Sequence, residues 1–230
     1  MSHYIKAIQS QYDPAGSFQH IGIVNFTPMV FIARKAMEAN DMKAFVDYTK
    51  ANPGKLNYGH AGVGSISHVA GVVFGGQVGI KANFVAYRGT GPALNDLVGG
   101  QLDFMIDQAL NNIPQIQAGT IKAYAVTSSK RLASLSNVPT TKEAGFDFEF
   151  SAWNAMTAPK GLPADITAKL ADALSRALDD PGIQKRYDEL GSTAPQGAER
   201  GPAGLQKLIE TEMARFTPML KSAPPSEEKK

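Results

Sequence analysis

A glycine- and serine-rich turn within residues 57–68, NYGHAGVGSISH, constrains the fold most, because it joins a short apolar strand to an amphipathic helix. Gly59, Gly62 and Gly64 allow positive φ and a close approach of the main chain to a ligand. Ser65 or Ser67 can cap the following helix. Such a turn presents backbone N–H groups to an anion, which predicts a site for a carboxylate or a phosphate. An ordinary strand-to-helix turn with a capped helix accounts for the same spacing equally well.

Strands, Gly-rich loops and helices alternate between residues 56 and 128, which is typical of a parallel α/β sheet. In open sheets of this kind, ligands bind beyond the carboxyl ends of the strands. The loops at 60–65, 88–92 and 107–112 are therefore expected to share one rim of the sheet. The expected strands are 29–33, 56–59, 83–87, 102–107 and 122–127, and the expected helices are 42–51 after the cap Asp41, 67–74, 93–98 and 113–117.

The chain from residue 151 onward has helices with apolar faces but too few strands for them to cover. One strand is expected at 152–158, followed by helices at 163–178, 181–190 and 202–220. Apolar residues recur with one-face spacing in the first and third of these helices. The imbalance indicates that part of a second lobe is missing or is supplied by another chain. The tail at 223–230 is expected to be disordered.

Composition excludes several classes of site and partner. The chain has no Cys, so disulfides, a thiolate nucleophile and a zinc–cysteine site are excluded, and its four His residues lack metal-binding spacing. Neither a metal nor a cofactor is expected. With 23 basic and 21 acidic residues, the net charge of +2 gives no nucleic-acid footprint. No apolar run approaches the roughly 18 residues that span a bilayer, and the first residues do not resemble a signal peptide.

Eight segments in order resemble the extracytoplasmic solute receptors of tripartite tricarboxylate transporters, the Bug/TctC family. The resemblance covers nearly the whole chain. It is carried by YDP at 12–14, TP at 27–28, ANPGKLNY at 51–58, GxGSxxHxAG at 62–71, YRGTGPALxDL at 87–97, GGQLD at 99–103, VPTxxExG at 138–145 and WxxxxAP at 153–159.

The resemblance implies an α/β fold of the type II periplasmic-binding-protein kind, with two lobes of mostly parallel sheets that close on a small organic acid. Such proteins deliver the acid to membrane transporter subunits and do no chemistry. The ligand is expected to be a di- or tricarboxylate, an aromatic carboxylate or an acidic amino acid. It is expected to be held by backbone N–H groups, small hydroxyls and bound waters.

The chain departs from the family pattern at its front. Family members carry a signal peptide, a strand and a Pro-x-Gly-Gly type loop that forms the other half of the carboxylate site, and residues 1–3 match an internal part of that pattern. By this alignment the middle lobe at 27–150 is whole, and 1–26 with 151–222 remains of the other, so the first lobe is incomplete. The resemblance implies a periplasmic location, and a cytoplasmic one is expected if Met1 is the true start.

Seven residues are candidates for ligand binding: Gly62, Gly64, Ser65, His68, Arg88, Thr90 and Asp107. His68 also fits a partly buried residue bonded to a neighbouring loop, and Arg88 fits a solvated rim residue. Asp107 either receives a ligand amine or hydroxyl or caps the next helix, and the cap is favoured. Ser65 with His68 lacks the surroundings of an acyl-transfer pair. Trp153 either gates the cleft or packs between the lobes.

Two other functions fit parts of the sequence. Gly62-x-Gly64-x-x-Ser67 after a strand, with Arg88 ending the next strand, is a weak match to an NADP-binding α/β enzyme, whose third glycine is replaced by Ser67. The missing half lobe also fits a non-functional fragment with exposed apolar helix faces.

Overall fold

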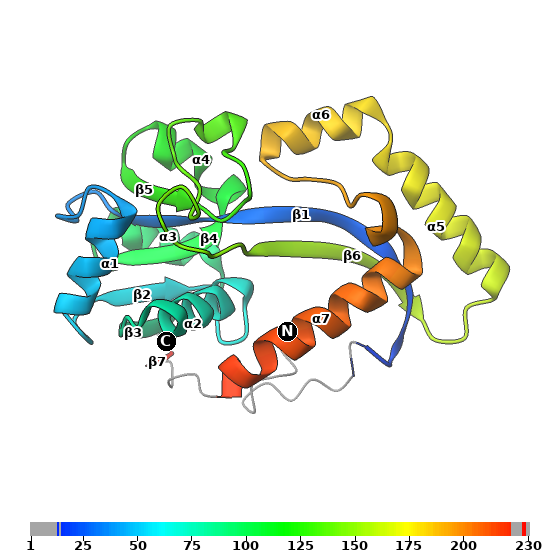
Figure 1. Cartoon of the computed structure of the whole chain (residues 1–230), viewed down its shortest axis with the longest axis horizontal. Coiled ribbons are helices and arrows are strands. Elements are labelled where there is room, and N and C mark those ends of the chain that lie inside the picture. Colours follow the sequence, from blue (N-terminus) through cyan, green and yellow to red (C-terminus); the bar gives the residue numbers. More distant parts are fainter. Residues whose placement is uncertain (1–12, 14, 222–226, 229–230) are drawn as a thin grey trace.

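A computed structural model describes residues 13, 15–221 and 227–228 and shows two lobes joined by two long strands (Figure 1). The main lobe carries a sheet with helices on both faces, and the second lobe is built mostly from three helices. The joining strands are β1 (Phe18–Arg34) and β6 (Ser151–Pro159), which pair antiparallel along nearly the whole length of β6. A domain boundary near residues 27 and 150 stays a prediction.

The sheet of the main lobe has the strand order β5-β1-β4-β2-β3. Strands β2, β3, β4 and β5 run in one direction, and the end of β1 runs against them between β5 and β4. Because β2, β3 and β4 are parallel neighbours, the loops after them meet at one edge. These elements are α1 (Met42–Ala51), β2 (Asn57–His60), α2 (Ile66–Val78), β3 (Asn83–Ala86), α3 (Thr90–Val98), β4 (Phe104–Gln108), α4 (Ala109–Gln117) and β5 (Ile121–Val126).

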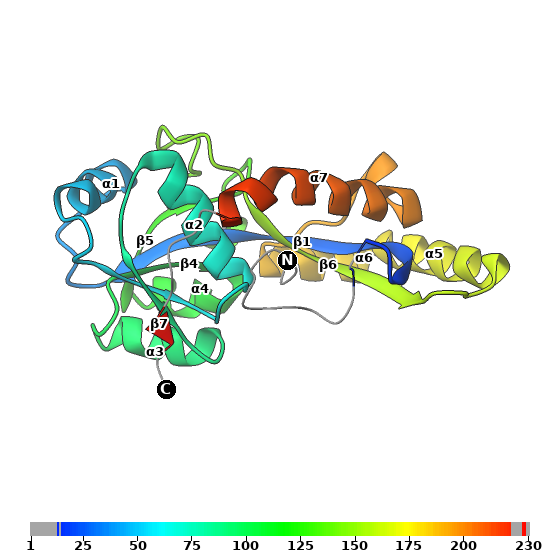
Figure 2. The ribbon, with the colours of Figure 1, turned by 90° about the horizontal axis from the view of Figure 1, so that it is seen from below.

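Alternating residues of β1 face two hydrophobic cores, one on each side of the sheet. Phe31 packs with α1 and α2, where its ring centroid lies 4.5 Å from that of Phe74. Val30 and Ile32 pack with α3 and α4 on the opposite face (Figure 2). The parallel order and the two covered faces confirm the α/β class expected from the sequence.

The second lobe contains α5 (Ala164–Leu178), α6 (Pro181–Leu190), η3 (Gly197–Glu199) and α7 (Gly201–Lys221). Helix α7 lies along one side of β1 and β6, and its far end packs on the main lobe, where Phe216 contacts Phe150 at 5.3 Å between ring centroids (Figure 2). The three helices begin and end within a residue or two of the expected positions.

Two sequence expectations need correction here. The strand expected at 29–33 begins eleven residues earlier at Phe18, because pairing with β6 overrides the turn-like residues Gly22, Asn25 and Pro28. The helix expected at 113–117 begins at Ala109, directly after β4, so the loop expected at 107–112 is a strand end and a first helical turn.

Most of the tail at 223–230 lies outside the described residues, as do residues 1–12, where the YDP segment begins. The two tail residues that are described, Glu227–Glu228, form the short strand β7 beside β3, so these two depart from the expected disorder.

Candidate functional site

Ser65 caps the helix that follows the glycine turn, as its residue type predicts. Its Oγ accepts the His68 N–H at 3.2 Å, and its backbone is extended, with φ −65° and ψ 162°. Gly62 and Gly64 have φ values of 108° and 80°, a conformation that L side chains rarely adopt. Gly59 is different: it lies inside β2, where an added Cβ would lie 2.2 Å from Leu102 Cδ1, so close packing is its role and the expected positive φ is wrong.

The buried His68 side chain is hydrogen-bonded to the glycine turn. It is 2% exposed, and its Nδ1 accepts the backbone N–H of Gly64 at 3.3 Å. The Gly64 N–H is therefore already bonded within the protein. Among the described residues, the first two N–H groups of α2, at Ile66 and Ser67, have no hydrogen-bond partner; Ile66 is half-buried and Ser67 is 1% exposed.

A second buried imidazole, that of His60, lies against the His68 ring, with the ring centroids 4.6 Å apart and the ring planes tilted by 47°. His60 is fully buried, and neither ring nitrogen has a hydrogen-bond partner among the described residues. Burial, with a smaller contribution from His68, lowers the pKa of His60 to about 4, against a weaker opposing effect of the Gly62 backbone. Burial also lowers the pKa of His68. Both rings are neutral at pH 7.

Asp107 connects the loops after β3 and β4. Its carboxylate is 1% exposed and accepts Thr90 Oγ1 at 3.3 Å and the side-chain amides of Asn111 and Asn112 at 3.1 Å each. Burial raises the pKa of Asp107, and these donors oppose the shift. The favoured helix-cap role is wrong, because the N-cap of α4 is Gln108 and Asp107 lies within β4. Asp107 instead ties α3 to α4.

The three loops lie together at one edge of the sheet, as expected from the parallel strand pattern. Tyr87 N–H donates to His60 O at 2.9 Å, and an added Cβ at Gly62 would lie 3.4 Å from Tyr87 O. Thr90, expected in a loop, is the first residue of α3. Arg88 is exposed at the end of β3 and makes no ion pair with any described residue. This rim therefore combines one unpaired guanidinium with the positive ends of α2 and α3.

The rim has the means to bind an anion but not to carry out acyl transfer. Ser65 Oγ accepts the backbone N–H of His68 and lies 3.1 Å from Ser67 Oγ, while the His68 ring is bonded to Gly64. A serine nucleophile needs a hydrogen bond between its hydroxyl and the ring of a base such as histidine. Here the Ser65 hydroxyl and the His68 ring are each bonded to backbone N–H groups instead.

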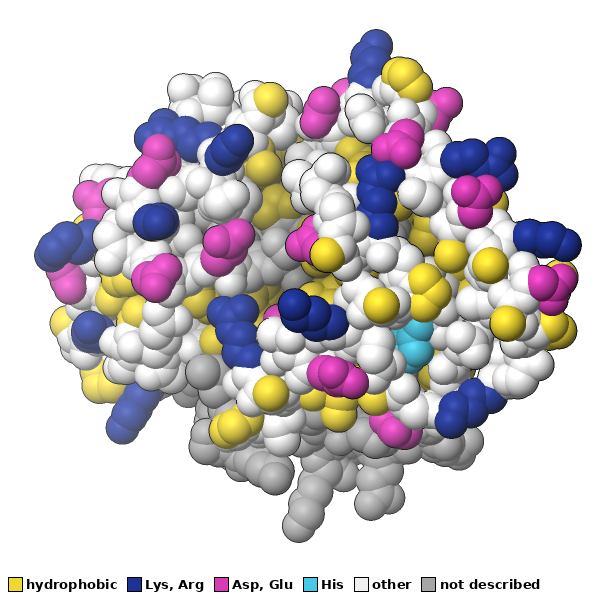
Figure 3. Space-filling model, turned by 45° about the vertical axis from the view of Figure 1, so that its right-hand side comes forward, with side chains coloured by type: hydrophobic (Ala, Val, Ile, Leu, Met, Phe, Trp, Pro, Cys, Tyr) yellow, Lys and Arg dark blue, Asp and Glu magenta, His cyan; other side chains and the backbone are white. Residues whose placement is uncertain are grey.

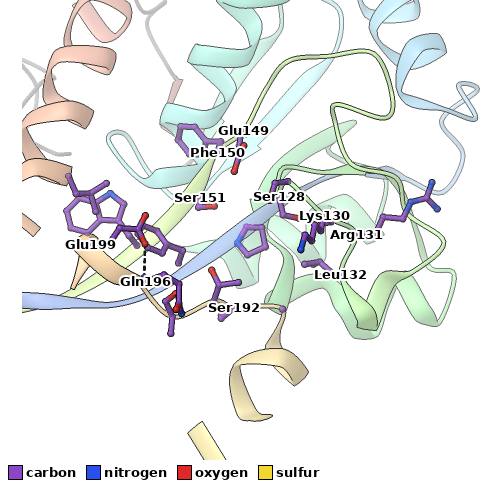
Figure 4. A pocket seen from close by; sticks show the side chains of 18 of the residues that line it. Ser128, Lys130, Arg131, Leu132, Glu149, Phe150, Ser151, Ser192, Gln196 and Glu199 are labelled. Carbon is purple, nitrogen blue, oxygen red and sulfur yellow. Dashed lines mark hydrogen bonds between the residues drawn. The ribbon is translucent and has the colours of Figure 1, made fainter. Parts of the chain in front are cut away.

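A large groove between the lobes, of about 970 Å³, contains none of the seven candidate residues. The loop after β5 (128–133) forms one wall and residues 191–196 form another, as Figure 4 shows for Ser128, Leu132 and Ser192. In the sheet order, β5 and β4 flank β1 on opposite sides, so this groove and the glycine turn lie on opposite sides of the joining strand. We call it the rear groove; Figure 3 shows the hollow between the lobes.

Sequence reasoning missed the rear groove, although the loop at 128–133 also follows the carboxyl end of a strand. Residues 191–196 are held to strand β1 by the hydrogen bond from Phe26 N to Thr193 O at 2.8 Å and by the contact of Thr27 Oγ1 with Ser192 Oγ at 3.0 Å. Trp153 lines this groove where the lobes join. Whether Trp153 gates a cleft stays a prediction.

The described part of the chain lacks both a metal-binding cluster and a membrane-spanning helix. It contains no group of three or more His, Asp or Glu side chains placed to hold a metal ion. None of its helices is both long and apolar enough to cross a membrane.

Comparison with known proteins finds a matching family model. Residues 2–223 match the model described as "Tripartite tricarboxylate transporter family receptor". A UPF0065 protein encoded in the TAR-I ttuE-ttuC′ intergenic region of Agrobacterium vitis is 37% identical over 92% of this chain. The chain spans 62% of the length of that relative.

Solved structures of similar fold include three receptors. MatC from Rhodopseudomonas palustris, solved with bound malate, is 35% identical with a TM-score of 0.82, over 92% of this chain and 72% of its own. Another R. palustris protein, solved with adipate, is 28% identical with a TM-score of 0.85. The match covers 96% of this chain and 74% of that protein. The periplasmic binding protein BugD is 37% identical with a TM-score of 0.81, over 95% and 73%.

Proposed function

The chain belongs to the tripartite tricarboxylate transporter receptor family, whose members are substrate-binding receptors and not enzymes, and on this premise we propose that it binds a small organic carboxylate. We further propose that the rim formed by Gly62, Gly64, Ser65, His68, Arg88, Thr90 and Asp107 is its half of the ligand cleft.

The observation that carries this proposal is the pair of unpartnered N–H groups at Ile66 and Ser67, at the start of α2. Helix α2 follows β2, and Arg88 follows β3, the parallel neighbour of β2. Two N–H donors at a helix N-terminus bind one carboxylate group, and a nearby guanidinium favours a second negative charge. The other residues have supporting roles: Ser65 and His68 fix the turn, and Thr90 with Asp107 fixes the first turn of α3.

The rear groove is the less suitable place for an anion because of its charges. Five carboxylates and three basic side chains line it, and two of those basic groups are paired: Arg131 with Glu143 at 2.8 Å and Arg215 with Glu212 at 4.0 Å. A dicarboxylate entering the rear groove would meet an excess of negative charge, which opposes binding.

The dicarboxylates in the solved relatives, malate and adipate, support this ligand class. The finer choice among di- or tricarboxylates, aromatic carboxylates and acidic amino acids is left to experiment. We propose that the ligand is passed to membrane transporter subunits and that the chain works in the periplasm, where its relative BugD is a binding protein.

Isothermal titration and thermal unfolding with malate, adipate, citrate, benzoate and aspartate test this function, with NADPH as the rival ligand. For half a cleft we expect dissociation constants of the order of 1 mM and a rise in melting temperature at ligand concentrations above that value. Arg88→Ala is expected to weaken binding about tenfold, whereas Lys130→Ala in the rear groove leaves it unchanged. The absence of any effect from every acid contradicts the proposal.

A further inference from the structure

The end of the main lobe that points away from the second lobe carries an excess of positive charge. It is the edge at which β2, β3 and β4 begin, opposite the rim at which they end, and it lies on the left in Figure 1. Segments 34–57, 79–83, 99–103 and 117–122 lie at this end. Together they contain seven Lys or Arg residues but only four Asp or Glu residues. The net charge of the whole chain is +2, so this end supplies its positive excess.

Some of these basic groups already have a partner within the protein. Arg34 Nε bonds Asp103 Oδ1 at 2.9 Å, and Lys43 Nζ bonds Asp47 Oδ2 at 2.9 Å. Lys122 Nζ is held by backbone oxygens of the segment before α1. The lysines that remain outnumber the carboxylates that remain.

Three of the remaining lysines lie together where α1 leads into β2. Lys50 is in the last turn of α1, and Lys55 Nζ donates to Asn52 Oδ1 at 3.5 Å in the loop that follows. The Gly54 N–H donates to Lys81 O at 2.9 Å, which joins this loop to the segment before β3. All three lysines are exposed, and none is in an ion pair among the described residues. We call Lys50, Lys55 and Lys81 the basic corner.

The basic corner has the chemistry for a diffuse anionic surface. Its ammonium groups are point charges on flexible stems, and it lacks the guanidinium that clamps a single carboxylate or phosphate from two sides. The rear groove contains none of the three lysines, so they do not line that cavity. A layer of anionic lipid headgroups attracts each lysine by roughly fivefold in affinity, and three such contributions multiply to roughly a hundredfold.

We propose that the basic corner binds the anionic headgroups of a phospholipid membrane. A contact there leaves the glycine rim uncovered, because the rim is at the opposite ends of the same strands. An acidic protein is the less suitable partner, because Lys is depleted at the core of protein–protein interfaces. The proposal uses none of the residues assigned to the carboxylate, so it stands or falls separately from ligand binding.

The test measures cosedimentation of the whole chain with vesicles of phosphatidylglycerol and phosphatidylcholine in equal parts, and with vesicles of phosphatidylcholine alone. We expect binding to the anionic vesicles at low salt and its loss at about 0.5 M salt, where charges are screened within a few ångström. The triple variant Lys50→Gln, Lys55→Gln and Lys81→Gln is expected to bind the anionic vesicles roughly a hundredfold more weakly.

A triple variant in the second lobe is the matched control. Lys160→Gln, Lys185→Gln and Lys207→Gln also remove three exposed lysines without an ion pair among the described residues. The change of net charge is the same, but it lies far from the basic corner, so binding should fall by less than roughly threefold. Melting temperatures close to that of the wild type show that both variants are folded.

Four results overturn the proposal. Two are the absence of binding by the wild type at low salt and an equal loss in the two triple variants, which would assign binding to net charge. A third is equal binding to neutral vesicles. The fourth is binding to poly-glutamate without binding to anionic vesicles, which would assign the basic corner to an acidic protein. No carboxylate ligand is present in any arm, so failure here leaves the proposed function untouched.

Discussion

The imidazole of His68 accepts the backbone N–H of Gly64, whereas neither ring nitrogen of His60, whose ring lies 4.6 Å away and tilted by 47°, has a partner at hydrogen-bond geometry among the described residues. Two histidines of similar burial thus have opposite hydrogen-bonding states. One of them holds the glycine turn, and the other only fills space behind it.

Replacing the two rings separately distinguishes these roles. His68→Leu removes the acceptor for the Gly64 N–H and is expected to lower the free energy of unfolding by about 1–2 kcal/mol. His60→Leu removes buried nitrogens that have no partner, so it is expected to cost at least 1 kcal/mol less. Urea unfolding of both variants checks this difference, and equal losses would show that His68 has no special contact with the turn.

Stability is expected to decrease in mild acid because of His60. In the unfolded chain this ring takes up a proton near pH 6.5, but the folded protein resists protonation down to about pH 4. The free energy of unfolding is therefore unaffected by the titration of His60 above pH 6.5. It decreases by up to about 3 kcal/mol as the pH falls from 6.5 to 4. The raised pKa of Asp107 acts in the opposite direction at the acid end.

His60→Leu serves as the control for this acid effect. We expect its free energy of unfolding to vary less between pH 6.5 and 4 than that of the wild type, since the leucine does not titrate. Parallel pH curves for the two proteins would rule out His60 as the source.

Gly71 of α2 packs directly on Tyr58 of β2. An added Cβ at Gly71 would lie 2.3 Å from Tyr58 Cε1, so Gly71→Ala forces a rearrangement and is expected to cost about 1–3 kcal/mol. Gly76 lies in the same helix with open space around its Cβ position, so Gly76→Ala is expected to stabilise by about 0.5–1 kcal/mol. The two melting temperatures should move in opposite directions; a shift of the same sign would mean that α2 does not sit this closely on β2.

The buried Asp107 carboxylate is expected to contribute more to the free energy of unfolding than an exposed surface carboxylate. Asp107→Asn replaces an acceptor of three side-chain donors by a group that itself carries N–H donors, at an expected cost of about 2 kcal/mol. Asp47→Asn removes only an exposed ion pair with Lys43 and should leave the free energy of unfolding nearly unchanged. Chemical denaturation compares them, and similar costs would argue against a structural role for Asp107.

The sequence predicted the order of elements and the shared rim because both follow from local patterns: strand and helix periodicity, the Ser65 cap and glycines at 62 and 64. It did not predict the first half of β1, where Gly22 and Pro28 look like turn residues and only pairing with β6 produces a strand. The ring contact of His60 with His68 and the three donors of Asp107 also depend on tertiary packing, which spacing along the chain does not encode. The rear groove could not be predicted because it forms only where residues 191–196 lie beside the loop after β5, which is far away in the sequence.

The proposed carboxylate site lies at the glycine rim, and a titration of the ¹⁵N-labelled chain with malate, followed through the amide chemical shifts, tests this location. We expect concentration-dependent shifts at 62–67 and 88–90 that Arg88→Ala diminishes. Shifts confined to 128–133 and 191–196 would instead place the acid in the rear groove.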